Sequence, residues 1–196
     1  MSNLLTKFAI IADPHYYSEA LGNSGKAYER RAGSDQKMLA LSRGTVLTAL
    51  EHIKNSGAKF LLIAGDLSND GERVSHEEMR EILYEFKKVM PVYVITATHD
   101  WCCDGNPRRY EGDKIFHDVE TVGVSELYEF YKDFGPDEAI SEFHTHQDKV
   151  SYIVRPCEGV SVFCLDDDQN GYGGSGYSDE HFGWIKEQTE KAKKRG

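Results

Sequence analysis

An apolar run that ends on a carboxylate constrains this chain more than any other feature. Residues 60–66 (FLLIAGD) give four apolar residues in a row, a pattern typical of a buried strand, and then lead through Ala-Gly to Asp66. Two further segments repeat the pattern: residues 8–15 (FAIIADPH) end in Asp-Pro-His, and residues 92–100 (VYVITATHD) end in Thr-His-Asp. A single acid at a strand end is ordinary loop chemistry. Three such endings, with two histidines among them, predict one shared site, because ligands of open α/β sheets bind beyond the carboxyl ends of the strands.

Helical patterns separate the three predicted strands. Residues 35–56 predict a long helix with Ser34 as its N-cap. Ser75 and Glu78 have capping-box spacing and predict a second helix that runs to about Val89. The alternation of strand and helix favours right-handed crossovers and a parallel sheet, which places the chain in the α/β class.

The second half of the chain continues the mixed pattern. Residues 101–123 show no period and are expected to form a long loop over the site. Residues 125–134 predict a helix, and residues 149–156 and 159–166 predict two neighbouring strands that can pair antiparallel. A last helix is expected from near Ser178.

Length and charge exclude several functional classes. A chain of 196 residues is expected to form a single domain over residues 1–196. The formal net charge of −10 disfavours a partner held by phosphate neutralisation, so no nucleic acid is expected. No segment has the roughly 18 continuous apolar residues of a membrane span, and no signal-peptide pattern opens the chain. We therefore expect a cytoplasmic protein without membrane contact, with its four cysteines reduced.

The strand endings carry metal-ligating residues. Asp13 and His15, two apart on an extended segment, can point the same way, and Asp66 can add a third ligand. A carboxylate can also bridge a second metal, the arrangement of two-metal hydrolytic sites that hold a phosphoryl group and activate water. His99 could then protonate a leaving oxygen while Asp100 fixes its tautomer. From their spacing alone, His99 and Asp100 fit a surface turn with a His-Asp contact almost as well as they fit this catalytic role.

Three motifs follow one another along the chain: Asp-Pro-His, the Gly-Asp of GDLSNDG, and Ala-Thr-His-Asp. In this order they resemble the motifs of the calcineurin-like metallophosphoesterase superfamily. The resemblance implies a sandwich of two sheets flanked by helices, a dinuclear centre of Mn, Fe, Zn or similar divalent ions, and hydrolysis of phosphomonoesters or phosphodiesters. It implies that Asp13 and His15 bind the first metal, that Asp66 bridges, that Thr98 takes a second-metal position, and that His99 is the acid or charge stabiliser.

The chain departs from the family pattern in two ways. The family has Asn where Thr98 stands, and this replacement is expected to weaken the binding of the second metal. The family's later histidine motifs, including a final G-H-x-H, do not occur before Gly196, so we expect the N-terminal portion of a longer domain that is incomplete at its C-terminus.

The other histidines offer no clear replacement. We expect His144 and His146 in an exposed loop, and His76 and His181 on the surface at helix starts. The acidic run of residues 166–168 is expected to end a strand in solvent.

The predicted activity is metal-dependent hydrolysis of a small-molecule phosphate ester, with metal-bound hydroxide as nucleophile. The alternative is a non-catalytic phosphoesterase-like module that binds one metal or a partner. An incomplete sandwich would also expose a sheet face and favour self-association.

Overall fold

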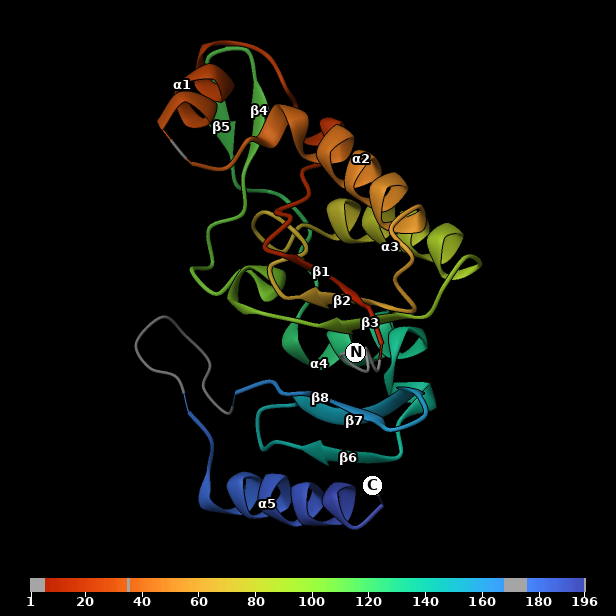
Figure 1. Cartoon of the computed structure of the whole chain (residues 1–196). Helices are drawn as coiled ribbons and strands as arrows, with labels where there is room; N and C mark the ends of the chain where they lie inside the picture. The colour runs from red at the N-terminus through yellow and green to blue at the C-terminus, as the bar shows by residue number, and fades with distance from the viewer. Residues whose placement is uncertain (1–5, 35, 168–175, 196) are drawn as a thin grey trace.

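Three parallel strands form the first sheet of the computed structural model, which describes residues 6–34, 36–167 and 176–195 (Figure 1). The strands β1 (Ala9–Ala12), β2 (Leu61–Ala64) and β3 (Val92–Ile95) lie in the order β1-β2-β3. Leu62 of β2 pairs with Ile10 on one side and Tyr93 on the other. The three predicted strands are confirmed, and all of them end at the same edge of the sheet.

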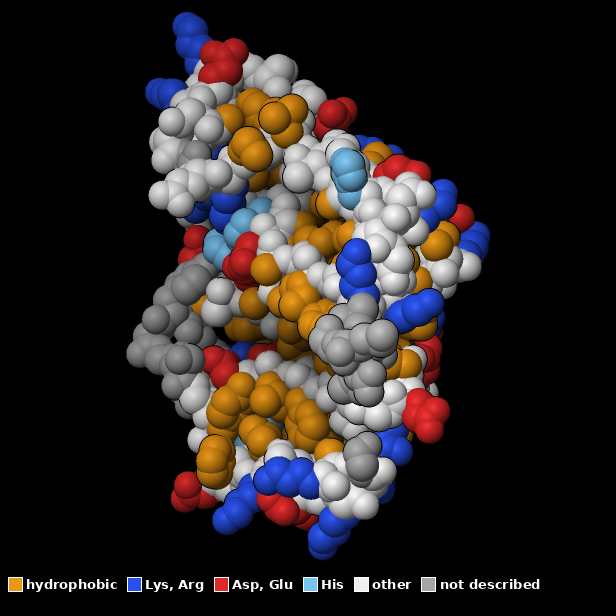
Figure 2. Space-filling model, viewed as in Figure 1, with side chains coloured by type: hydrophobic (Ala, Val, Ile, Leu, Met, Phe, Trp, Pro, Cys, Tyr) orange, Lys and Arg blue, Asp and Glu red, His pale blue; other side chains and the backbone are white. Residues whose placement is uncertain are grey.

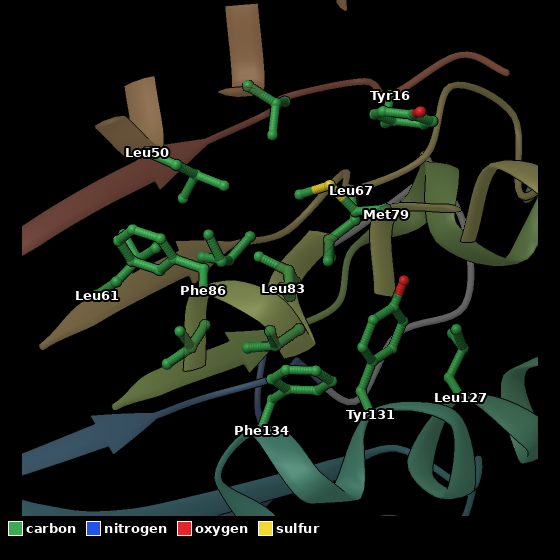
Figure 3. Close-up of a cluster of buried hydrophobic side chains, with 14 of the residues drawn as sticks. Tyr16, Leu50, Leu61, Leu67, Met79, Leu83, Phe86, Leu127, Tyr131 and Phe134 are labelled. Atoms are coloured by element: carbon green, nitrogen blue, oxygen red, sulfur yellow. The ribbon is translucent and has the colours of Figure 1, made fainter. Parts of the chain in front are cut away.

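Two helices cover one face of this sheet. They are α2 (Ser42–Lys54) and α3 (Arg73–Lys87), the crossovers between successive strands. Figure 3 shows Leu50 of α2, Leu61 of β2 and Leu83 of α3 in the main core. Full burial of one such side chain stabilises a fold by about 1.5–3 kcal/mol. The packing fixes the sheet and therefore the edge where the strands end.

The starts of both helices differ from the sequence prediction. Ser34 is the last residue of α1 (Lys26–Ser34), and a 3-10 turn, Leu39–Leu41, precedes α2. The helix α3 begins two residues before Ser75, whose hydroxyl accepts a hydrogen bond from the Ser18 backbone N–H at 3.2 Å. Glu78 accepts from the Ser18 hydroxyl at 2.7 Å. The predicted capping box was wrong because these side chains bind the segment after β1 instead.

A second, antiparallel sheet packs against the other face of the first. It contains β6 (Ser141–His144), β7 (Val150–Cys157) and β8 (Val160–Cys164), in that order. Buried side chains from both sheets fill the space between them: Phe60, Tyr93, Tyr152, Val154 and Cys164. The antiparallel pairing of β7 and β8 is confirmed, whereas β6 was not predicted, because the short run SEFH has little apolar character.

The last helix lies on the outer face of the second sheet (Figure 1). It is α5 (Asp179–Lys193), and the Ser178 hydroxyl caps it by accepting from the His181 backbone N–H at 3.2 Å. The His181 ring stacks on Phe143 of β6 with centroids 4.2 Å apart and is fully buried, so its predicted surface position was wrong. The order helices, sheet, sheet, helix confirms the expected α/β fold.

The segment predicted as a long loop contains a hairpin. Its strands are β4 (Arg109–Glu111) and β5 (Lys114–Phe116), with Tyr110 opposite Ile115. Tyr110 packs with Tyr28 of α1 in a separate small core. The remaining elements are the helix α4 (Val124–Tyr131) and 3-10 turns at Glu19–Leu21, Thr98–Trp101, Lys132–Phe134 and Pro136–Glu138. The prediction failed here because the hairpin is held by α1 rather than by its own short strands.

Phe8 and Ile10 leave an apolar part of the first sheet exposed, at 47% and 57% of their surface. Self-association through such a face stays a prediction. The four cysteines are free, as expected. None of the described helices is long and apolar enough to cross a membrane.

Candidate metal centre

The chain segments that follow β1 and β2 run side by side beyond the sheet. The Asp13 backbone N–H donates to the Gly65 carbonyl at 3.2 Å, and the His15 N–H donates to the Asp66 carbonyl at 2.9 Å. Figure 2 shows histidine, acidic and basic side chains gathered near the end of β1. The predicted meeting of these strand endings is therefore present in the backbone itself.

The backbone at this edge adopts a conformation that non-glycine residues rarely occupy. Asp13, His15 and Asp66 have φ of 50°, 41° and 49°, in the left-handed region. Such backbone costs of order 1–3 kcal/mol per residue and persists where the surroundings enforce it, most often at functional sites. The strain falls on three of the four residues for which metal binding was predicted, Thr98 being the exception.

Three side chains bring their donor atoms together. His15, Asp66 and His99 each offer one ligand atom within 4.8 Å of the others, and this is the one such group of at least three residues among those described. His15 Nε2 lies 3.8 Å from Asp66 Oδ2. Asp66 Oδ1 accepts from the His99 backbone N–H at 3.0 Å, which holds the carboxylate close to both rings. Imidazole nitrogen with carboxylate oxygen suits Zn, Fe and Mn ions.

The protonation of His15 fits a metal ligand. Its Nδ1 lies 3.4 Å from the Ser68 carbonyl, which favours the tautomer that donates from Nδ1 and leaves a lone pair on Nε2. Burial, followed by the charge of Lys37, lowers the pKa of His15 below its ordinary value. A neutral Nε2 lone pair then faces the Asp66 carboxylate, and a cation between them would satisfy both groups.

His99 has a different environment. Its Nδ1 lies 3.4 Å from Asp70 Oδ1, and this contact raises the pKa of the imidazole above its ordinary value. Lys37 Nζ lies 3.2 Å from the same ring nitrogen. Arg108 Nη1 approaches the other oxygen of Asp70 at 3.5 Å. Sequence reasoning did not identify Asp70, Lys37 or Arg108, although Asp70 stands four residues after Asp66 in the quoted GDLSNDG stretch.

Asp100 makes its contacts to the backbone. Its carboxylate is fully buried and accepts from the Ser68 N–H and the Ala97 N–H, each at 2.9 Å. Burial raises the pKa of Asp100 to about 7. Asp100 therefore joins the chain after β2 to the chain after β3, and Asp70 is the carboxylate that lies beside the His99 ring.

Asp13 and Thr98 lie outside the cluster of three. The exposed Asp13 lines a cavity of about 470 Å³ together with His15 and Lys37. Thr98 opens the 3-10 turn that carries His99 and lines a separate cavity of about 440 Å³ with Gly65. The two residues line different cavities next to the cluster.

Other polar residues have structural roles that the sequence did not reveal. His76 is fully buried, and both of its ring nitrogens have hydrogen-bond partners. Nδ1 accepts from the Tyr131 hydroxyl at 2.6 Å, and Nε2 donates to the Asp100 carbonyl at 2.8 Å. Asp166 is also buried, and Lys149 Nζ lies 3.3 Å from its carboxylate. The predictions of a surface position for His76 and a solvated carboxylate at Asp166 were therefore wrong. Residue 168 of the acidic run lies outside the described residues.

The other histidine pair lies away from the cluster. His144 ends β6 with an exposed side chain, 3.0 Å from Glu142. His146 follows in the turn before β7, so neither residue joins the candidate ligands.

The match to known proteins agrees with this geometry. The family model described as calcineurin-like phosphoesterase matches residues 6–191. A comparison with curated protein sequences gives no match. The family match spans both sheets and all the residues of the cluster. The chain therefore belongs to the calcineurin-like phosphoesterase family, whose members are metal-dependent hydrolases of ester bonds.

Proposed function

We propose that the protein hydrolyses phosphodiester or phosphomonoester bonds of a small-molecule substrate at a centre of two divalent cations. The observation that carries the proposal is the convergence of His15, Asp66 and His99 within 4.8 Å. In this proposal Asp13 and His15 would hold the first cation, Asp66 would be a ligand to both cations, and Thr98 would lie at the second position. Manganese, iron and zinc fit these oxygen and nitrogen donors.

When bound, the cations would supply Lewis acidity and a hydroxide-forming water near neutral pH. The chain's own contribution is to hold the donor atoms in place. The His99 backbone N–H holds Asp66 by one oxygen, so that the other faces His15. The Ser68 carbonyl holds His15 in the tautomer that presents Nε2. Preorganised groups of this kind need no rearrangement when charge develops.

His99 is the proposed proton donor to the leaving oxygen. Its raised pKa keeps a larger fraction of the ring protonated near neutral pH than an ordinary histidine would have. The ring is partly open, with 23% of the side chain exposed, so a substrate can reach it. Asp70 takes the orienting role that the sequence suggested for Asp100, which instead holds the backbone that carries His99.

The experiment compares the wild type with Asp66→Asn, which keeps the shape of the side chain and removes its charge. Asp113→Asn is the matched control, because Asp113 is 66% exposed and pairs with Lys26 away from the site. Bound Mn²⁺ is counted by calorimetry, and turnover is followed with bis-p-nitrophenyl phosphate and p-nitrophenyl phosphate. We expect metal binding and turnover in the wild type and in the control, with both lost in Asp66→Asn.

Two outcomes would contradict the proposal. Turnover that survives both EDTA and Asp66→Asn would remove the metal centre from the mechanism. One bound ion without turnover in the wild type would support the alternative, a metal-binding module without catalysis.

A further inference from the structure

Lys37 brings an ammonium group to the candidate centre from a distant part of the chain. It lies between α1 and α2, and its Nζ donates to the Asn69 carbonyl at 3.1 Å. The same Nζ lies 3.2 Å from Nδ1 and 3.4 Å from Nε2 of the His99 ring. The ammonium therefore lies next to the His99 ring, close to both of its nitrogens.

Asp70 has two basic neighbours, Lys37 and Arg108. Arg108 Nη1 lies 3.5 Å from Asp70, whereas Lys37 Nζ lies 3.9 Å from it. Lys37 Nζ is closer to the His99 ring than to the Asp70 carboxylate. The lysine side chain is only 12% exposed, so its ammonium has also lost most of its water.

The charge of Lys37 would also attract an anion in the adjoining cavity. Lys37 lines the cavity of about 470 Å³ that Asp13 and His15 also line. A phosphoryl group bound by cations at the candidate metal centre would place negative oxygens within reach of Lys37. Lysine is a common phosphate ligand because its charge and three N–H donors are concentrated at one point.

We propose that Lys37 is a catalytic residue that binds a non-bridging oxygen of the substrate's phosphoryl group beside His99. This inference rests on the proposed function and adds a residue to it. Asp70 is the positioning residue, because its carboxylate contacts Lys37, His99 and Arg108 while only 4% of its side chain is exposed.

The test uses Lys37→Met, which keeps the length of the side chain and removes its charge, and Lys37→Arg, which keeps the charge. Lys26→Met is the control, because Lys26 is 78% exposed and lies on α1. Calorimetry measures the binding of Mn²⁺ to each protein and then the binding of inorganic phosphate to the Mn²⁺-loaded form. Turnover of p-nitrophenyl phosphate is measured in parallel, and circular dichroism checks the fold.

We expect Lys37→Met to bind Mn²⁺ like the wild type but to lose roughly ten- to hundredfold in phosphate affinity and in kcat/KM, the range for a lost charge-assisted hydrogen bond. Lys37→Arg should retain most of the phosphate affinity, and Lys26→Met should match the wild type. Phosphate binding unchanged in Lys37→Met would overturn the inference while metal-dependent turnover stood. Equal losses in both Lys37 variants with weakened Mn²⁺ binding would also overturn it, because the lysine would then act by packing. A wild type without Mn²⁺ binding or turnover would overturn the proposed function, and the inference with it.

Discussion

The His99 ring stands edge-on to the His15 ring, with centroids 4.9 Å apart and planes at 89°. The two neighbours have opposite pKa shifts. Burial lowers the pKa of His15, and the hydrogen bond with Asp70 raises that of His99. Opposed environments of this kind separate the roles of adjacent titratable groups. His15 is suited to donate a lone pair, and His99 is suited to carry a proton.

The protonation of His99 should depend on Asp70. In Asp70→Asn the pKa of His99 should fall, because the hydrogen bond that raises it most is lost while burial and the charge of Lys37, which lower it, remain. The measurement is an NMR titration of the histidine ring protons in EDTA-treated protein. Asp118→Asn, at a side chain that is 65% exposed and paired with Arg109, is the control. An unchanged His99 titration in Asp70→Asn would show that Asp70 does not govern this proton.

Gly65 should be indispensable to the turn that presents Asp66. Its φ is +75°, and a Cβ added there would lie 2.6 Å from the Ala97 Cβ. Gly65→Ala should therefore lower the free energy of unfolding by about 2–4 kcal/mol, since left-handed strain and overpacking act together. Gly44→Ala within α2 is the matched control and should stabilise by up to about 1 kcal/mol, because its Cβ meets no atom within 4 Å. Urea unfolding of both variants measures their free energies of unfolding. Equal free energies for the two variants would contradict the expected strain.

Periodicity and strand endings predicted the parts of the fold that depend on local pattern. The runs before Asp13, Asp66 and His99 are strands because their apolar residues pack between helices and a second sheet. Their common edge follows from the parallel order, so the meeting of His15 and Asp66 was predictable.

Contacts between segments that are distant in the chain could not be predicted from the sequence. Lys37 reaches His99 across 62 positions of the chain, and nothing local to Lys37 marks it. Asp70 could be quoted within a motif, but only the fold shows that it, rather than Asp100, lies beside the His99 ring. His76 was misplaced for the same reason, because Tyr131 and the Asp100 carbonyl that satisfy it come from later elements.

His76 should make stability depend on pH. Burial lowers its pKa to about 4, whereas an unfolded histidine titrates near 6.5. The unfolded chain therefore binds a proton at a higher pH than the folded chain does. The stability from a neutral His76 is complete above about pH 6.5 and is lost as pH falls toward 4, by about 3 kcal/mol in total.

The difference between wild type and His76→Gln isolates this effect. The buried Asp100 and Asp166, with pKa values raised to about 7 and about 6, favour folding as pH falls, and they contribute equally to both proteins. Wild type should exceed His76→Gln in unfolding free energy at pH 7, and the gap should shrink by about 2–3 kcal/mol at pH 4.5. Urea unfolding at both pH values measures it, with the exposed His52→Gln as control. A gap that stays constant between the two pH values would mean that folded His76 takes up its proton as readily as the unfolded residue does.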